Sequence, residues 1–197
     1  MNAEQQVLYK VQKIRDINAL AVPLNGFLKE APFWKISCLW IWKIVLTVQR
    51  EMLTVKLMSH LHSEEARKFE NYSYVLLYAG DALLRAEKFE RAEECFNRIF
   101  KIEAKGNQDI LLSARMGKLE CRIEIARSRM KRDDRIVFSG SIEKDFLALI
   151  RKDVFKTSSA IQQNIRSRLG RADMNISVLT IRSETAHARE VYQRSTI

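Results

Sequence analysis

The sequence predicts an all-α protein, and three observations carry that prediction. Only six glycines and two prolines punctuate 197 residues, fewer than a β-rich protein needs for its turns. Ala, Leu, Ile, Lys, Arg and Glu dominate the composition, a mixture that favours helices. Apolar residues recur at three- and four-residue intervals in segments separated by short polar stretches. With 47% hydrophobic and 29% charged residues, the chain has the make-up of a globular protein.

The N-terminal region, residues 1–62, is predicted to hold two helices. Residues 4–21 place a set of apolar side chains near one helical face: Val7, Val11, Ile14, Ile17 and Leu20. Pro23 and Gly26 are expected to end this first helix, because both favour turns. A second helix is expected to follow within residues 33–62.

The second helix is the most apolar segment of the chain. Its uninterrupted apolar-type stretch runs from Ile36 to Val48 and already contains Lys43. Since a helix needs about 20 predominantly apolar residues to cross a bilayer, we expect no transmembrane span. An anchor lying in the membrane surface stays open beside a helix that is covered by protein.

Three tryptophans lie in the same segment, namely Trp34, Trp40 and Trp42. They leave more apolar surface than a lone hairpin can bury, so we expect them to bind a protein partner. A neighbouring subunit is a natural cover for such a surface. The sequence therefore also predicts a homo-oligomer as one form of the protein.

Residues 63–106 are predicted to form a helical hairpin. The stretch YVLLYAGDALLRAEKFERAEECFNRIFKI, residues 74–102, carries apolar residues every three or four positions. With Ser73 as position one, it resembles the 34-residue tetratricopeptide repeat. Each large side chain of that repeat needs a small one opposite it, since overpacking costs roughly 1–3 kcal/mol. Six residues match the repeat's packing positions: Leu76, Gly80, Leu83, Phe89, Ala92 and Phe96.

The resemblance has departures and covers one clear copy. Ile99 replaces the usual alanine of the second helix, Glu87 replaces the turn glycine, and Ala104 stands where a proline often ends the unit. About three repeats are usually needed to bury a repeat's faces, so the flanking helices are expected to be degenerate or capping units. The resemblance implies a right-handed superhelical α-solenoid, and an unrelated αα-hairpin is the alternative.

The resemblance also implies a binding surface. In this family the first helix of each unit lines a concave ligand surface, and five residues would point there: Tyr74, Leu77, Asp81, Leu84 and Arg85. Repeats that clamp a C-terminal carboxylate carry Lys and Asn where this chain has Leu77 and Asp81, so that ligand is disfavoured. For each of these residues, packing against a neighbouring helix is the alternative.

A wider run, residues 40–105, is similar to the start of repeat-containing subunits of the anaphase-promoting complex, a nuclear ubiquitin ligase. This resemblance implies a self-associating scaffold with a cell-cycle role in a larger assembly. It depends mostly on repeat positions that many proteins share.

The C-terminal region, residues 107–197, is basic, with eighteen Lys and Arg against eleven Asp and Glu. Four helices are expected in it. Their predicted ranges are 108–131, 142–156, 159–169 and 174–194, with Gly170 capping the third.

Two basic clusters lie in this region, RSRMKRDDR at residues 127–135 and the group Arg166, Arg168 and Arg171. Phosphate contact is physically reasonable for both. Asp133 and Asp134 interrupt the first cluster, however, and no aromatic residues are interleaved for base stacking. A basic helical protein that binds nucleic acid is therefore the alternative function. A nuclear-import signal and a solvated or acidic-partner surface are further interpretations.

Candidate catalytic groups are sparse. His60 and His62 are two residues apart, which directs them to different sides of a helix, and Cys38 and His187 have no motif around them. The sequence contains no P-loop, dinucleotide-binding or nucleophile-elbow motif. We therefore expect no catalytic, cofactor-binding or metal site, no cofactor and no enzymatic activity.

The three cysteines, Cys38, Cys95 and Cys121, have no CxxC spacing, which argues against a disulfide framework and favours a reducing compartment. The N-terminus lacks the basic start and apolar run of a secretory signal. We therefore expect an intracellular protein, nuclear or cytoplasmic.

These patterns together predict three segments: an N-terminal helical segment at residues 1–62, a tetratricopeptide-like hairpin at 63–106 and a basic helical region at 107–197. The expected function is that of a non-catalytic scaffold or adaptor that binds other proteins. Nucleic-acid binding is the alternative.

Overall fold

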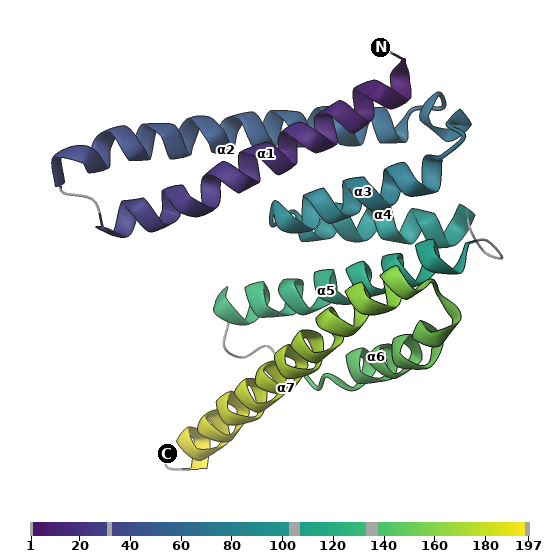
Figure 1. The fold of residues 1–197 in the computed structure, drawn as a ribbon. Helices are drawn as coiled ribbons and strands as arrows, with labels where there is room; N and C mark the ends of the chain where they lie inside the picture. Colours follow the sequence, from purple (N-terminus) through teal and green to yellow (C-terminus); the bar gives the residue numbers. More distant parts are fainter. Residues whose placement is uncertain (1, 31–32, 103–106, 133–137, 196–197) are drawn as a thin grey trace. The chain divides into compact units, whose positions relative to one another are not determined.

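The computed structural model describes residues 2–30, 33–102, 107–132 and 138–195, and within them it is all-helical (Figure 1). This confirms the predicted all-α class. No strand occurs among these residues, and two short 3-10 turns lie at Ala66–Lys68 and Val154–Lys156. The α-helices are α1 (Ala3–Glu30), α2 (Phe33–His62), α3 (Tyr72–Arg85), α4 (Phe89–Ile102), α5 (Gln108–Arg132), α6 (Ser141–Asp153) and α7 (Ser159–Ser195).

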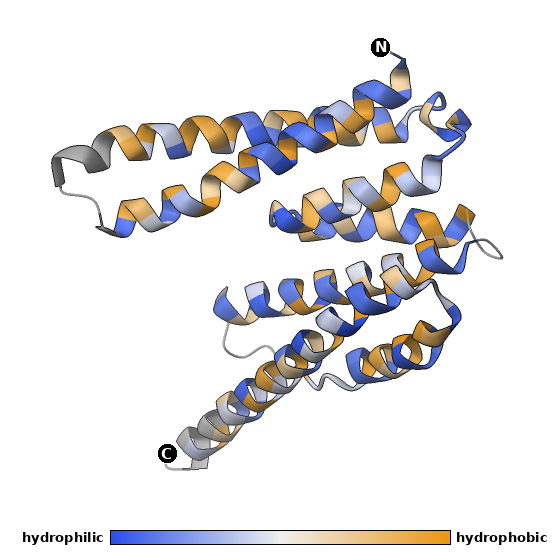
Figure 2. Ribbon diagram, viewed as in Figure 1, coloured by the Kyte–Doolittle hydropathy of each residue, from blue (hydrophilic) through white to orange (hydrophobic). Residues whose placement is uncertain are grey.

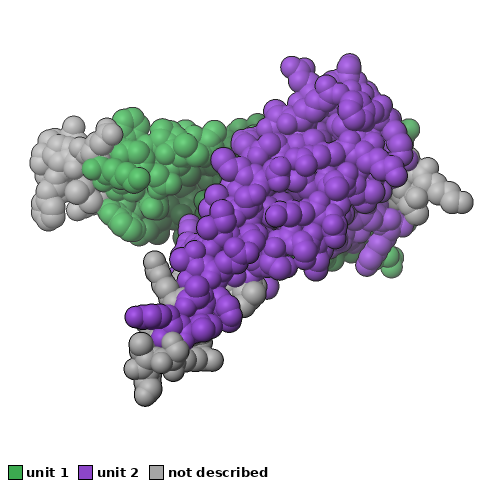
Figure 3. Space-filling view, turned by 90° about the horizontal axis from the view of Figure 1, so that it is seen from below, with its two compact units in different colours: residues 1–95 green, residues 96–197 purple. Residues whose placement is uncertain are grey.

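The chain forms two compact units, residues 1–95 and residues 96–197, which Figure 3 shows in separate colours. The division falls inside α4. We call these parts unit 1 and unit 2 and describe each by itself. The three segments expected from the sequence stay a prediction.

Unit 1 is built on α1, which packs against both α2 and α3. The apolar face predicted for the first helix is largely buried, and only Leu20 of that set is exposed. The hydroxyl of Tyr72 at the start of α3 donates a hydrogen bond of 2.8 Å to the carbonyl of Leu61 near the end of α2. The buried apolar residues of the three helices are Val7, Val11, Ile14 and Ile17, then Leu46, Leu57, Met58 and Leu61, then Tyr72, Val75, Leu76, Ala79, Ala82 and Leu83.

The predicted end of the first helix at Pro23 is wrong, because α1 continues to Glu30. A proline within a helix removes one backbone hydrogen bond and crowds the preceding turn. The packing of α1 along the 30-residue α2 opposes that local cost. Gly26 faces open space and imposes no turn.

The turn between α3 and α4 ends α3 with a residue in the left-handed conformation. Glu87 has φ = 59°, the one positive φ among the described non-glycine residues. The Lys88 N–H donates to the Leu83 carbonyl at 2.9 Å, and the Glu87 N–H donates to the Leu84 carbonyl at 3.1 Å. This pair of bonds is a Schellman motif, a helix ending in which glycine usually occupies the left-handed position.

Unit 2 has its core between α5, α6 and α7, which pack against one another. Phe96 of α4 lies against α5, where a Cβ added to Gly117 would come within 2.4 Å of the Phe96 ring. Only glycine therefore fits this close contact without movement of the ring. The core residues shared by the three helices are Leu112, Met116, Leu119, Ile123, Met130, Leu147, Ile150, Val154, Ile165, Leu169, Ala172, Ile176 and Leu179.

The prediction of two separate C-terminal helices is wrong, because α7 runs unbroken through Gly170. The glycine faces open space and does not have a positive φ. Leu169 and Ala172 on either side of it are buried in the unit 2 core. Tertiary packing thus holds the helix across a residue that weakens it by about 1 kcal/mol.

Candidate functional site

Helix α2 has apolar residues on two opposite faces. Leu46, Leu57 and Leu61 lie on the inner face and are buried. The opposite face carries large apolar residues whose exposed fractions are between 39% and 61%. Figure 2 shows hydrophobic residues recurring along the whole described length of this helix. An exposed apolar stripe of this kind marks a surface that another molecule covers.

The exposed residues follow a regular spacing. Starting at Cys38, the intervals are three, four, three, four and three residues, which keeps the side chains on one narrow stripe. We call this stripe the outer seam. It consists of Cys38, Ile41, Val45, Val48, Met52 and Val55, all of them exposed.

Of the two described tryptophans predicted to bind a partner, Trp42 borders the outer seam, one turn from Cys38 and from Val45, whereas Trp40 lies outside it. Trp40 is 51% exposed and Trp42 is 62% exposed. The Lys43 ammonium lies 5.2 Å from the centre of the Trp40 ring. The side chain of Trp34 lies outside the described residues.

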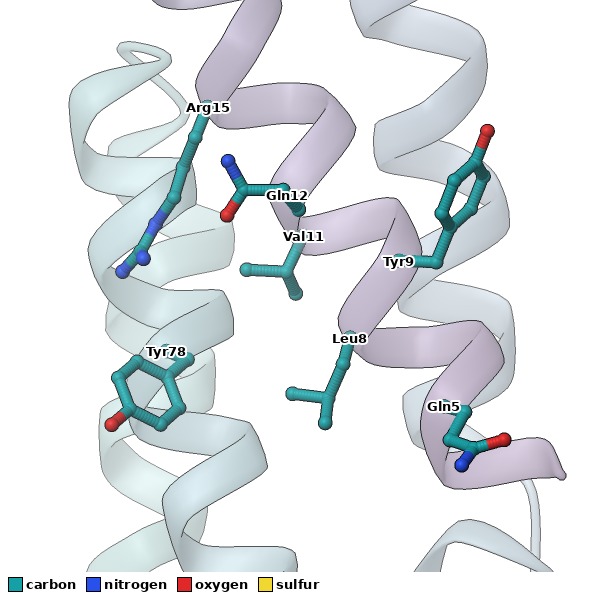
Figure 4. Close-up of a pocket in the computed structure, with 7 residues that line it drawn as sticks. All are labelled: Gln5, Leu8, Tyr9, Val11, Gln12, Arg15 and Tyr78. Atoms are coloured by element: carbon teal, nitrogen blue, oxygen red, sulfur yellow. The ribbon is translucent and has the colours of Figure 1, made fainter. Parts of the chain in front are cut away.

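A shallow groove lies between α1 and α3 in unit 1, with a volume of about 450 Å³ (Figure 4). Figure 4 shows Leu8 and Val11 of α1 pointing toward the side of Tyr78 on α3. The Arg15 guanidinium lies 5.5 Å from the centre of the Tyr78 ring. The lining residues are Gln5, Leu8, Tyr9, Val11, Gln12, Arg15 and Tyr78.

Of the residues predicted to line a concave surface, Asp81 is held by two cations. Its carboxylate accepts from Arg15 at 3.3 Å and pairs with Arg85 at 3.2 Å. Asp81 therefore already has partners within unit 1. Tyr74 is exposed, and Leu77 and Leu84 are half-buried. None of the five predicted residues lines the groove, whose α3 side chain is Tyr78, one turn after Tyr74.

The residues predicted to pack the repeat lie where burial is high. Phe89 is half-buried, and the other five, Leu76, Gly80, Leu83, Ala92 and Phe96, are buried. Their role in packing a repeat stays a prediction.

Several basic residues of unit 2 form ion pairs with acids, among them Arg127 and Arg168 of the two predicted basic clusters. Arg168 forms a two-point contact with the Glu120 carboxylate, including an Nε–Oε1 hydrogen bond of 2.8 Å. The other ion pairs include Arg115–Asp153, Arg122–Glu143 and Arg151–Asp173, each at 2.7 Å, and Arg127–Glu124 at 2.5 Å. Part of the predicted first cluster, residues 133–135, and the side chain of Arg132 lie outside the described residues.

The histidines of α2 are engaged with neighbouring oxygens. A ring nitrogen of His60 lies 2.9 Å from the Lys56 carbonyl, and one of His62 lies 2.6 Å from a Glu94 carboxylate oxygen. Within the described ranges, no group of three or more His, Cys, Asp and Glu side chains is arranged to hold a metal ion. In the same part of the chain, no helix has the length and apolarity to cross a membrane.

Sequence reasoning selected the tryptophans but missed the outer seam itself and the α1 side of the groove. The signal for the seam was present as its alternating three- and four-residue spacing from Cys38 to Val55. The groove depends on the packing of α1 against α3, which no local pattern contains.

Comparison of the chain with family models, with curated proteins and with solved structures finds no match. The all-α class, seen in the described residues, is therefore what is established about the fold. The function has to be inferred from the residues of this chain.

Proposed function

We propose that this protein is a non-catalytic helical scaffold that binds other proteins within a larger assembly. The observation that carries the proposal is the outer seam of α2, a continuous apolar stripe exposed on a helix whose inner face is already buried. Covering such a stripe removes apolar surface from water and favours association. The groove between α1 and α3 offers a second contact surface in unit 1.

The turn after α3 supports the tetratricopeptide-like part of the proposal. Glu87 has the left-handed conformation at the position where the repeat has its turn glycine. Gly80 and Ala92, at the small positions of the repeat, are both buried. In this proposal α3 and α4 form one repeat of an α-solenoid, and α1 with α2 forms a degenerate unit before it. The resemblance to subunits of the anaphase-promoting complex suggests a ubiquitin-ligase assembly as the setting.

The alternative, a basic protein that binds nucleic acid, is less well supported. Phosphate binding needs cations that are available to replace counterions. The arginines of unit 2 that form the ion pairs described above already have carboxylate partners, as Arg168 does with Glu120. Breaking such pairs would offset part of the gain from phosphate contact.

The proposal is tested by affinity purification of the full chain from its native cell extract, with quantitative identification of the bound proteins. The test variant is Val48→Glu with Met52→Glu, which places two charges on the outer seam. We expect a specific set of proteins to be recovered with the unmodified chain and lost with this variant. Because the contact is apolar, the recovery should persist at high salt, whereas phosphate-driven binding weakens steeply.

The matched control is Val178→Glu on α7, a residue that is 57% exposed on the other unit. This variant adds a charge to an exposed apolar position without touching the seam, so recovery should be unchanged. Equal recovery by the seam variant and the unmodified chain would contradict the proposal. Recovery of nucleic acid that is lost at high salt would favour the alternative.

A further inference from the structure

We propose that the outer seam of α2 pairs with the outer seam of a second copy of this chain, with the two helices parallel and in register. This inference rests on the proposed scaffold function and names one occupant of its binding surface. The pairing would make the protein a two-chain scaffold.

The spacing of the seam is that of a coiled coil. Residues at alternating intervals of three and four fall at the a and d positions of a heptad, the positions that face a partner helix. The a positions are occupied by Cys38, Val45 and Met52, and the d positions by Ile41, Val48 and Val55. All six side chains are exposed, so the seam is complete and uncovered over this length.

The charged residues beside the seam favour the parallel orientation. Glu51 occupies a g position and Lys56 the following e position, and in a parallel pair the g residue of one helix meets the e residue of the other five positions on. Glu51 of each copy would then lie beside Lys56 of the second copy. The antiparallel arrangement with the same apolar layers would instead place Glu51 beside Ile44, an apolar residue.

Lys56 lies in a setting where an added carboxylate is favourable. Burial, and secondarily repulsion by the charge of Lys56, lowers the pKa of Lys10 on α1. Glu51 of a second copy would reduce that repulsion. Glu51 also forms an ion pair with Lys88 of its own chain, which is partly exposed, so a contact with Lys56 of the second copy would share or replace that pair.

The same flanks disfavour a membrane surface as the occupant. A helix that lies in the interface between lipid and water has basic residues beside its apolar face. Here the five e and g residues from Trp42 to Lys56 include one basic residue, Lys56, and one acidic residue, Glu51, which would face anionic lipid. Charge complementarity therefore favours a second copy of α2.

Cys38 provides a direct test of orientation. In the parallel pair the two Cys38 residues meet at an a layer, within the Cα separation of about 4.4–6.8 Å that a disulfide requires. Cys95 and Cys121 are buried. Mild oxidation of the purified full chain should give a covalent dimer on a non-reducing gel, and Cys38→Ser should abolish it.

A second layer makes the test independent of Cys38. Val55→Cys in the Cys38→Ser background should also form a covalent dimer, because Val55 meets Val55 in the same register. In an antiparallel pair Cys38 would meet position 55 instead. Cross-linking only in chains that carry both Cys38 and Val55→Cys would therefore overturn the parallel arrangement.

Sedimentation velocity over a concentration series tests the energetics. We expect Val48→Glu to raise the dimer Kd by about a hundredfold or more, since it places like charges in the central layer. Glu51→Lys should raise the Kd by about tenfold, and adding Lys56→Glu should restore it, because the exchanged pair is again complementary. Val178→Glu on α7 is the control and should leave the Kd unchanged, and circular dichroism should show equal helix content for all variants.

The outcomes separate this inference from the proposed function. Even a weak specific dimer has a Kd below about 100 µM. A chain that is still monomeric at that concentration therefore overturns the inference. If this monomeric chain binds other proteins and Val48→Glu abolishes that binding, the scaffold function stands without the dimer. If it instead floats with vesicles of phosphatidylserine and phosphatidylcholine, a membrane is the occupant. A three-chain mass, or failure of Lys56→Glu to rescue Glu51→Lys, also contradicts the parallel pair.

Discussion

Unit 1 and unit 2 each contain a long helix with apolar residues on two opposite faces, and the two helices differ in their outer faces. On α2 every position of the outer seam is apolar from Cys38 to Val55. On α7 the corresponding stripe contains Met174, Val178 and Ile181, but it continues with Thr185 and Ala188. Only α2 therefore presents an unbroken apolar surface of more than two helical turns.

The inner faces of α2 and α7 also differ in their polar residues. The inner face of α7 contributes Leu169, Ala172, Ile176 and Leu179 to a continuous apolar core. In unit 1, Asn18 of α1 and Thr54 of α2 are buried polar residues, and an Arg50 nitrogen donates to Asn18 Oδ1 at 3.4 Å. Among the described residues, Thr54 Oγ1 and Asn18 Nδ2 have no hydrogen-bond partner. Unit 1 thus has buried polar groups without hydrogen-bond partners beside its apolar core.

The largest expected change in the free energy of unfolding distinguishes the buried residues of α2 and α7 from their exposed ones. Ile176→Ala and Leu57→Ala each remove a fully buried side chain and should lower the free energy of unfolding by about 2–5 kcal/mol. Val178→Ala and Val48→Ala change exposed residues and should each stay within about 0.5 kcal/mol. Denaturant unfolding at low protein concentration measures all four variants. A loss for Val48→Ala as large as that for Leu57→Ala would show that the chain itself buries the outer seam.

The next prediction concerns two residues with a left-handed backbone conformation, Gly140 before α6 and Glu87 after α3. Gly140 has φ = 68°, and a Cβ there would lie 2.6 Å from Thr180 Oγ1, so Gly140→Ala should cost about 2–4 kcal/mol from conformation and crowding together. Glu87→Gly should raise the free energy of unfolding by about 1 kcal/mol, because glycine adopts this conformation without strain. Glu87→Ala is the control, since it removes the charge but keeps a Cβ. If alanine stabilised as much as glycine, charge and not backbone conformation would be the cause.

Local sequence signals predicted the helical class and most helix positions, but they failed where packing opposed them. Pro23 and Gly170 are strong helix-ending signals in a sequence, yet α1 continues through Pro23 and α7 continues through Gly170. In each case a neighbouring helix packs along the helix and offsets a local cost of at most a few kcal/mol. A single sequence does not contain that neighbour.

The candidate site could be predicted in part. Trp40 and Trp42 were recognisable by residue type, and the outer seam was recognisable by its spacing. The contact of Asp81 with Arg15 was not, because Arg15 is 66 residues away in the chain and reaches Asp81 only through the packing of α1 on α3. The same holds for Gly117, whose need for a bare backbone arises from the Phe96 ring.

A smaller effect compares two buried hydroxyls, Thr54 in unit 1 and Ser183 in unit 2. Ser183 Oγ accepts a 2.8 Å hydrogen bond from the Phe138 N–H, so Ser183→Ala should cost about 1–2 kcal/mol by leaving that donor unpaired. Thr54→Val should instead stabilise by about 1 kcal/mol, since it replaces a hydroxyl without a partner by a methyl of similar size. Thr54→Ser keeps the hydroxyl and loses the methyl, so it should destabilise. Thermal unfolding of the three variants gives the signs, and a loss of stability in Thr54→Val would mean that its hydroxyl has a partner after all.

The smallest effect concerns Asp153 of unit 2, whose role in folding depends on pH. A hydrogen bond from Lys156 at 2.8 Å, with Arg115 on the other carboxylate oxygen at 2.7 Å, holds the pKa of Asp153 below its ordinary value. Because the folded pKa is the lower one, the charged carboxylate stabilises unit 2 above the ordinary pKa. That contribution is lost as the pH falls through the folded value.

Asp153→Asn should therefore lower the free energy of unfolding at pH 7 by less than about 1 kcal/mol, as expected for a pair near the surface. The difference from the unmodified chain should shrink below about pH 4, where the unfolded carboxyl takes up its proton. Urea unfolding of both chains at pH 7 and pH 3 measures this change. A difference that is equal at the two pH values would assign the effect to shape and not to charge.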